Sequence, residues 1–191
     1  MINELRVKSI EWFKSLYEMD FIIVDTETTG LNTSLDEIIE IGVLSKDGEE
    51  IFESKIKPIK PISRGAMEVH GISEKDVVKS PKFYQIYNEL RRIMDNNNFV
   101  GYSANFDYEM LINNCKMHSC EEIKILEVFD VMTPYSNYWG EWNEYFGNCK
   151  WQKLTEACKQ QGIRVENSHS AIGDCKLTLE LIRKISSLSI D

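Results

Sequence analysis

The chain has 191 residues, 42% hydrophobic and 28% charged, which fits one globular domain over residues 1–191. It has no run of about 18 apolar residues and no secretory pattern at its start, so we expect no transmembrane helix and a cytoplasmic location. The formal net charge of −9 argues against a large, sequence-independent duplex binder, which needs many Lys and Arg contacts to phosphate.

Cysteines and basic residues add weaker constraints. Five cysteines without dense spacing indicate reduced thiols. Cys115, His118 and Cys120 lie close in sequence but lack the second ligand pair of a structural zinc site. Short basic groups are more often solvated faces than phosphate contacts. The groups in this chain are Lys55, Lys57, Lys60 and Arg64, then Arg91 and Arg92, then Lys150 and Lys153.

The apolar pattern predicts a helix within residues 1–20, followed by an α/β core over residues 21–187. The run Phe-Ile-Ile-Val at 21–24 is typical of a strand buried on both faces. Further elements are expected in this order: strands 38–44 and 50–56 joined by a turn at 46–48, an irregular stretch 58–80, helix 83–93, strand 99–102, helix 106–117, strand 124–129, an aromatic-rich loop 133–150, and helices 151–161 and 172–187. This order predicts a mixed five-stranded sheet flanked by helices.

Two carboxylates follow the first predicted strand. Asp25 and Glu27 are two residues apart, and in extended backbone that spacing puts both side chains on one face. Ligands of open α/β sheets gather at the carboxyl ends of strands. The pair is therefore a candidate metal or catalytic site, although an isolated Asp-x-Glu is common.

Two later carboxylates sit at helix starts. Asp107 precedes Met110 and Leu111 by three and four residues, so it faces the apolar side of its helix, where simple capping is the alternative explanation. Asp174 heads a stripe continued by Leu177, Leu181 and Ile185. Several carboxylates that converge favour a bound divalent cation, because otherwise they repel one another.

A histidine lies just ahead of the last helix. His169 comes five residues before Asp174, on the loop that leads into the helix, and is close enough to reach the same cavity. Imidazole titrates near neutrality and can take a proton from an attacking water. Four carboxylates and this histidine together point to metal-assisted phosphodiester hydrolysis.

At these residues the chain resembles the DEDDh exonuclease family, which includes the DNA polymerase III epsilon subunit, oligoribonuclease and ribonuclease T. The resemblance covers about residues 21–187. It rests on the segment Val-Asp-Thr-Glu-Thr-Thr-Gly-Leu at 24–31, on Asn-Phe-Asp at 105–107 with Tyr108, and on His-Ser-Ala-Ile-Gly-Asp at 169–174. The segment Val-His-Gly-Ile at 69–72 also looks like epsilon-type members.

The resemblance implies a ribonuclease H-like fold and a 3′→5′ exonuclease that releases nucleoside monophosphates from single-stranded ends, with DNA as the expected substrate. It implies two Mg²⁺ or Mn²⁺ ions, the first held by Asp25, Glu27 and Asp174 and the second contacted by Asp25, with Asp107 acting on it directly or through water, and His169 as general base. Thr28 and Leu31 are expected to contact the terminal nucleotide by backbone contact and apolar packing, and Asn105 and Phe106 are further expected substrate-binding residues.

One segment departs from the family pattern. Members commonly have His-Asn-Ala ahead of the second-motif Phe-Asp, whereas this chain has Tyr102, Ser103, Ala104 and Asn105. Metal binding through Asp107 is unaffected by the change, but substrate preference can shift. Thr28 argues mildly against oligoribonuclease, which tends to have Met there.

Other functions stay open at this point. An RNA-directed exonuclease and a proofreading subunit of a DNA polymerase both fit the motifs, although the given sequence ends soon after the last helix and leaves little for docking. A non-catalytic nucleic-acid-binding module is disfavoured because all four carboxylates and the histidine are present. The aromatic residues of 133–150 either stack unpaired bases or bury the loop and form a partner surface, and we favour the second interpretation.

Overall fold

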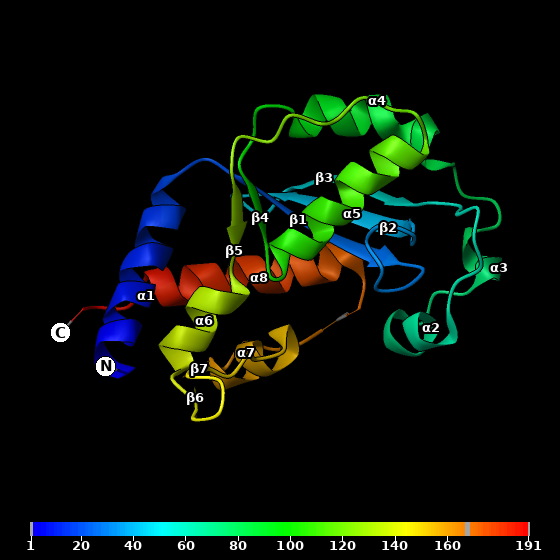
Figure 1. Ribbon diagram of the computed structural model, residues 1–191. Helices are drawn as coiled ribbons and strands as arrows, with labels where there is room; N and C mark the ends of the chain where they lie inside the picture. The colour runs from blue at the N-terminus through cyan, green and yellow to red at the C-terminus, as the bar shows by residue number, and fades with distance from the viewer. Residues whose placement is uncertain (1, 167–168, 191) are drawn as a thin grey trace.

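The computed structural model describes residues 2–166 and 169–190; residues 1 and 191, the ends of the predicted domain, and residues 167–168 before His169 lie outside them. Figure 1 shows a central sheet with helices on both faces. The helices are α1 (Ile2–Glu18), α2 (Arg64–His70), α3 (Glu74–Val77), α4 (Phe83–Met94), α5 (Ala104–Met117), α6 (Met132–Trp139), α7 (Leu154–Gln160) and α8 (Ala171–Ser186), and the strands are β1 (Ile22–Thr28), β2 (Ile38–Ser45), β3 (Glu50–Lys55), β4 (Phe99–Gly101), β5 (Val128–Asp130), β6 (Trp142–Asn143) and β7 (Asn148–Cys149).

The main sheet has five strands in the order β3-β2-β1-β4-β5. Strands β1, β2 and β3 pair antiparallel, whereas β1, β4 and β5 pair parallel. The predicted mixed five-stranded α/β fold is therefore confirmed. The β2–β3 hairpin turns through Gly48, whose φ of 97° is a conformation that glycine adopts without strain.

Alternate residues of β1 serve two hydrophobic cores. Ile23 packs on one face with residues of α1, α6 and α8. Ile22 and Val24 pack on the other face with residues of α4 and α5. Both faces of β1 are covered, which explains why its first half reads as a continuous apolar run. The predicted stripe of α8 is confirmed, since Leu177, Leu181 and Ile185 are buried.

Strand β1 extends beyond its parallel neighbour β4. The β1–β4 ladder pairs Ile22 with Phe99 and Ile23 with Val100, whereas the β1–β2 ladder continues to Thr28. Asp25 and Glu27 thus lie inside β1 rather than after it, in the half that β4 does not border. Helix α5 begins just beyond β4 and takes the place of the missing strand (Figure 1).

The prediction that residues 58–80 are irregular is wrong, because this segment contains α2 and α3. The hydroxyl of Ser63 accepts a hydrogen bond from the Ala66 amide at the start of α2, and Gly71 ends α2 with a φ of 72°. Helices of 7 and 4 residues are too short to show a helical repeat of apolar residues, so the prolines and glycines dominated the prediction.

The expected aromatic loop 133–150 is also wrong. It contains α6 and the short β6–β7 hairpin. Pro134 lies in the first turn of α6, where its missing amide costs nothing, and Gly140 ends the helix with a φ of 79°. Tyr135 and Tyr138 are buried in the core. For these two residues, the favoured interpretation that the aromatic side chains bury the segment against the domain is confirmed.

Other predicted bounds shift by a few residues. The fifth strand is confined to β5, and the helix expected at 151–161 is the shorter α7. All five cysteines are free thiols. No helix among residues 2–166 and 169–190 is long and apolar enough to cross a membrane. The cytoplasmic location stays a prediction.

Candidate functional site

Three carboxylates from two distant segments meet at the outer half of β1. One oxygen each of Asp25, Glu27 and Asp174 lies within 4.8 Å of the other two. Asp25 and Glu27 point to the face of β1 that α8 covers, and Asp174 comes from the first turn of α8. All three side chains are partly buried. We call these three residues the acidic cluster.

Asp107 approaches β1 from the α5 side. The β1–β4 ladder has ended at this level, and the Thr26 amide donates to Asp107 Oδ1 over 3.0 Å instead of to a strand. The Thr26 hydroxyl donates to the same oxygen over 2.6 Å. The Asp107 side chain is buried, and its charge acts on Asp25. Asp107 is therefore adjacent to the acidic cluster but is held by β1 itself.

The carboxyls of this region hold their protons more tightly than usual. Burial raises the pKa of Asp25 well above its ordinary value, and the charges of Asp107, Asp174 and Glu27 add to the effect. Burial, then the charge of Asp174, raises the pKa of Glu27 to about 8. Burial also raises the pKa of Asp107, against the opposing effect of its Thr26 hydrogen bonds. Without a cation, the site favours partly protonated acids.

The donor set fits a hard divalent cation. Oxygen is the donor atom that Mg²⁺ and Mn²⁺ prefer, and Asp25, Glu27 and Asp174 each offer a carboxylate oxygen to one point. A bound cation favours the ionised carboxylates and so opposes the effect of burial, and of neighbouring charges, that raises the pKa values of Asp25 and Glu27.

His169 lies directly before α8. It is exposed, and its φ of 69° is a left-handed conformation that few non-glycine residues adopt. Its backbone amide donates to Asp174 Oδ1 over 3.3 Å. Ser170 follows as the N-cap of α8, and its hydroxyl accepts from the Gly173 amide. This local bonding ties His169 to the carboxylate of Asp174.

A cavity of about 340 Å³ opens beside the acidic cluster. Glu27 and Thr28 line it from β1, and Leu31 lines it from the loop that follows. Phe106 of α5 also lines the cavity, and α2 closes the far side with residues that include Val69 and His70. The cavity is largely apolar, and Glu27 is the member of the acidic cluster that lines it.

The four predicted substrate-binding residues do not all lie in the same place. Thr28, Leu31 and Phe106 line the cavity, whereas Asn105 is exposed at the start of α5 and does not. Leu31 is 87% exposed, so its side chain is available to a ligand. The Thr28 hydroxyl donates to the Gly30 carbonyl, which fixes the turn after β1.

His70 also belongs to this cavity, although no role was predicted for it. The Ile72 amide donates to His70 Nδ1 over 3.0 Å, so Nε2 carries the proton and donates to the Thr28 carbonyl over 3.2 Å. Burial lowers the pKa of His70. The only sequence signal was its position in the segment at 69–72, because α2 was not predicted.

Glu40 is a second residue that the motifs did not single out. It lies on β2, it is buried, and its Oε2 accepts a hydrogen bond from the Ala171 amide over 3.0 Å. A lone carboxylate in the apolar run Ile-Ile-Glu-Ile-Gly-Val-Leu was the available signal.

The other candidate sets do not converge on the acidic cluster. His118 Nε2 lies 3.5 Å from Glu37 Oε1, and its ring stacks on Phe83; within residues 2–166 and 169–190, His118 does not converge with Cys115 and Cys120 as a set of metal ligands. Several of the basic residues pair within the protein: Lys60 with the Leu35 carbonyl, Arg64 with Glu68, Arg91 with Asp95 and Glu121, and Lys150 with Glu141.

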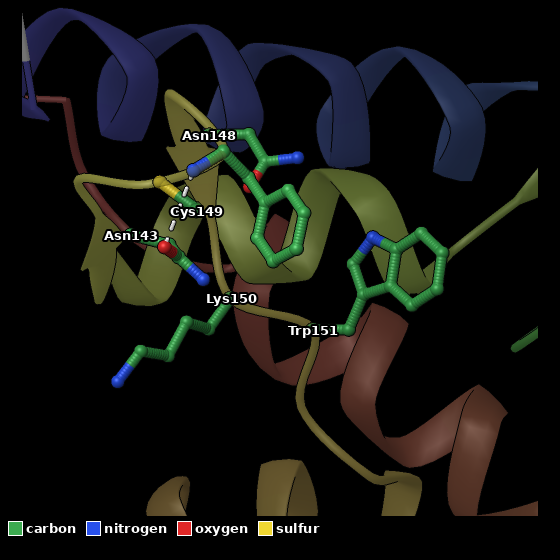
Figure 2. Close-up of a pocket in the computed structure, with 6 residues that line it drawn as sticks. Asn143, Asn148, Cys149, Lys150 and Trp151 are labelled. Atoms are coloured by element: carbon green, nitrogen blue, oxygen red, sulfur yellow. Dashed lines mark hydrogen bonds between the residues drawn. The ribbon is translucent and has the colours of Figure 1, made fainter.

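Residues 141–151, which we call the aromatic hairpin, contain a second cavity of about 330 Å³. Figure 2 shows Asn143 and Asn148 on one side of it and Trp151 on the other, with Lys150 extending outward. Tyr145, Phe146 and Trp151 are 88%, 70% and 71% exposed. None of the predicted site residues lines this cavity.

Comparison with known proteins identifies the family. The model of the RNase T family, described as exonuclease, matches residues 22–182. The uncharacterized exonuclease CP81 of Escherichia phage 186 is 32% identical over 175 residues, which are 88% of this chain and 89% of that protein. The DNA polymerase III subunit epsilon of Treponema pallidum is 27% identical over 90% of this chain and 79% of its own length.

Among solved structures, E. coli exonuclease I in complex with a dT13 oligonucleotide superposes with a TM-score of 0.72 at 16% identity. The match covers 88% of this chain but only 41% of exonuclease I, so it establishes a shared ribonuclease H-like fold. The match to the family model and the similarity to the phage protein establish the family. This chain belongs to the RNase T exonuclease family and is a nuclease.

Proposed function

We propose that this protein is a 3′→5′ exonuclease that removes nucleoside 5′-monophosphates from single-stranded 3′ ends, DNA in preference to RNA, with two divalent cations, Mg²⁺ or Mn²⁺. The observation that carries the proposal is the convergence of Asp25, Glu27 and Asp174 from two segments about 150 residues apart. Family membership supplies the reaction class.

The carboxylates have distinct roles in this proposal. Asp25, Glu27 and Asp174 would hold one cation, and Asp25 with Asp107 would hold the second. Bound cations stabilise the negative charge that develops on the attacking and leaving oxygens of the phosphodiester. Thr26 keeps the buried Asp107 in place through two hydrogen bonds to one oxygen.

His169 is the proposed general base. It is exposed at the mouth of the site and is joined to Asp174 through its backbone amide, so its imidazole can reach a water that attacks the phosphorus. It would take the proton from that water as the new oxygen–phosphorus bond forms. The left-handed backbone at His169 is the kind of local strain that proteins retain at functional positions.

The cavity next to the acidic cluster would hold the terminal nucleotide. Leu31 and Phe106 offer apolar surface to the base, and the backbone around Thr28 offers hydrogen bonds. Asn105 is proposed to contact the strand outside the cavity, because it is exposed at the start of α5. Exonuclease I, which shares the fold, has been solved with a dT13 oligonucleotide, and this supports DNA as the substrate.

The test is a time course on matched DNA and RNA oligonucleotides, each blocked alternately at the 3′ or the 5′ end. We expect mononucleotides from 3′-open DNA with Mg²⁺ or Mn²⁺ and none with chelator. Glu89→Ala, on the exposed side of α4, is the matched control for Asp25→Ala. Full activity in chelator, or degradation only from the 5′ end, contradicts the proposal.

A second candidate is a proofreading subunit, favoured by the similarity to the epsilon subunit over 90% of this chain. Gel filtration of the purified protein with the replicative polymerase of its own organism tests this. Co-elution at micromolar concentration supports the proofreading role, and separate elution supports a free-standing nuclease.

A further inference from the structure

We infer that Glu40 and Gly42 of β2 form a seat for the first turn of α8, and that Glu40 is a positioning residue for Asp174 and His169. The inference deepens the proposed function and rests on it for the roles of those two residues. It assigns to β2 the task of setting the distance between the part of the site carried by β1 and the part carried by α8.

The register of the sheet places the seat opposite the cluster. In the antiparallel β1–β2 ladder, Glu40 pairs with Glu27 and Gly42 pairs with Asp25. Side chains of directly paired residues lie on the same face of a sheet. A helix that rests on Glu40 and Gly42 therefore brings its own side chains next to Asp25 and Glu27.

Gly42 allows the helix to approach closely. A Cβ atom at position 42 would lie 2.6 Å from the Ile172 nitrogen and 2.8 Å from the Ala171 carbonyl carbon. Both are backbone atoms, so the helix would have to move to accommodate any side chain. In the second turn, the Cys175 thiol contacts the Gly42 carbonyl with Sγ at 3.5 Å.

Glu40 fixes the rotation and height of the helix end. Its Oε2 accepts from the Ala171 amide over 3.0 Å, and the side chain is 4% exposed. The first amides of a helix have no partner within the helix, and a negative charge near them is favourable. Glu40 thus meets a need of α8 that the Ser170 hydroxyl, bonded to Gly173, does not meet.

The bond acts on the site through one turn of helix. Ala171 is three residues before Asp174 and two after His169, so a shift at Ala171 moves both side chains relative to Asp25 and Glu27. Glu40 is not one of the three residues whose oxygens converge. It would therefore tune cation binding through α8 and not as a ligand.

The experiment separates the effect of the length of the Glu40 side chain from the effect of its charge. Mn²⁺ binding is measured by calorimetry, alongside the melting temperature and the kcat and KM for a DNA oligonucleotide. Glu40→Gln keeps an oxygen that can reach the Ala171 amide, whereas Glu40→Asp keeps the charge but is one methylene shorter. Gly42→Ala tests the close approach. Ile185→Val, at the far buried end of α8, is the control for general destabilisation, and Glu89→Ala, on the exposed side of α4, is the control for charge.

We expect Glu40→Asp to weaken Mn²⁺ binding roughly 10- to 100-fold, as removal of a residue that orients ligands does, with kcat reduced and KM little changed. Glu40→Gln should stay within about threefold of wild type, because its side-chain oxygen still reaches the Ala171 amide. The small loss is expected because a neutral acceptor bonds less strongly than a charged one. Gly42→Ala should weaken Mn²⁺ binding at least as much as Glu40→Asp. Ile185→Val should lower the melting temperature without weakening Mn²⁺ binding.

Failure of the seat and failure of the proposed function look different. If wild type binds no Mn²⁺ and degrades no oligonucleotide, the proposed function is wrong and this inference falls with it. If wild type does both and Glu40→Asp binds Mn²⁺ equally well, only the seat is wrong. If Glu40→Gln binds as weakly as Glu40→Asp, an acceptor that reaches the Ala171 amide is not enough to position α8, which also overturns the seat.

Discussion

The acidic cluster and the aromatic hairpin both place side chains against their usual preference. At the cluster, carboxylates are partly buried beside one another, and at the hairpin, large aromatic rings face solvent. The cluster is assembled from β1 and α8, which are far apart in the sequence, and neighbouring hydrogen bonds from β2 and α5 support it. The hairpin is local, and its exposed rings Tyr145 and Phe146 contact each other edge to face.

This difference separates a built site from an exposed surface. Burying several carboxylates costs free energy, so other parts of the fold must stabilise the arrangement. The hydrogen bonds from Thr26 to Asp107 and from Ala171 to Glu40 do so. Exposing two rings on a short hairpin costs little and needs no support from distant elements. We therefore expect substitutions at the cluster to change chemistry strongly and substitutions at the hairpin tip to change little.

The largest effect is expected at Asp25. Asp25→Ala should abolish mononucleotide release, a loss of at least about 10,000-fold, because it removes a residue proposed to contact both cations and several kcal/mol of transition-state stabilisation. The melting temperature in chelator should not fall, since a repelling charge is removed. Residual activity above about one percent of wild type would contradict the two-cation assignment.

His169→Ala should reduce kcat by about 100- to 1,000-fold, the contribution of a positioned general base. Mn²⁺ binding measured by calorimetry should be nearly unchanged, because the imidazole is not proposed as a ligand. A variant that loses Mn²⁺ binding together with activity would show that His169 shapes the metal site and does not act as the base.

The metal-free protein should become less stable as pH rises. The pKa of Glu27 is raised from 4.5 to about 8, mainly by burial, so the folded carboxyl keeps its proton where the unfolded one has lost it. The folded state then binds more protons, and the free energy of unfolding falls between about pH 4.5 and 8. In chelator, thermal melts should show this decline.

Glu27→Gln and Mg²⁺ should each reduce that decline. Glutamine has no proton to lose, and a cation stabilises the ionised carboxylates. Each ~1 kcal/mol of difference corresponds to roughly 2–4 °C in melting temperature for a chain of this size. A wild-type melting temperature that is constant or rises with pH in chelator would show that folding does not raise the pKa of Glu27.

The smallest effects are expected at the hairpin. Tyr145→Ala and Phe146→Ala should change the free energy of unfolding by less than about 0.5 kcal/mol, because both rings are mostly exposed. Tyr135→Ala, in the buried part of the same aromatic segment, should cost roughly 3–5 kcal/mol in urea unfolding.

Oligonucleotide binding sharpens the comparison further. Trp139, which is 43% exposed, is expected to leave the affinity for single-stranded DNA unchanged when replaced by alanine. Base stacking on an aromatic ring is worth on the order of 1–3 kcal/mol. If Trp139→Ala weakens binding by that amount at an unchanged melting temperature, the exposed end of α6 contacts the single-stranded substrate.

Much of the site's geometry could be predicted because it follows regular periods. The two-residue spacing of Asp25 and Glu27 and the stripe behind Asp174 depend on strand and helix geometry alone. The role of β2 could not be predicted, because the partner of Glu40 is set by the strand register and by a helix 131 residues away in sequence. The bond from Thr26 to Asp107 depends on where β4 stops, which no periodicity reveals.

The missed elements have a common cause. Helices α2, α3 and α6 are short and end at or near turn residues, so their apolar residues do not complete a repeat. Their positions are set by packing, as the burial of Tyr135 and His70 shows. Short helices of this kind need tertiary contacts before they form. The assignment of residues 1–191 to one domain stays a prediction.

Strand β1 is constrained on both of its faces at once. Asp25 and Glu27 face α8, whereas Thr26 between them is bonded to Asp107 of α5. An insertion or deletion of a single residue after Ile22 would exchange the two faces, sending the carboxylates toward α5 and Thr26 toward α8. Length variation among functional relatives should therefore be excluded from this strand and should collect in peripheral segments such as the turn at 144–147.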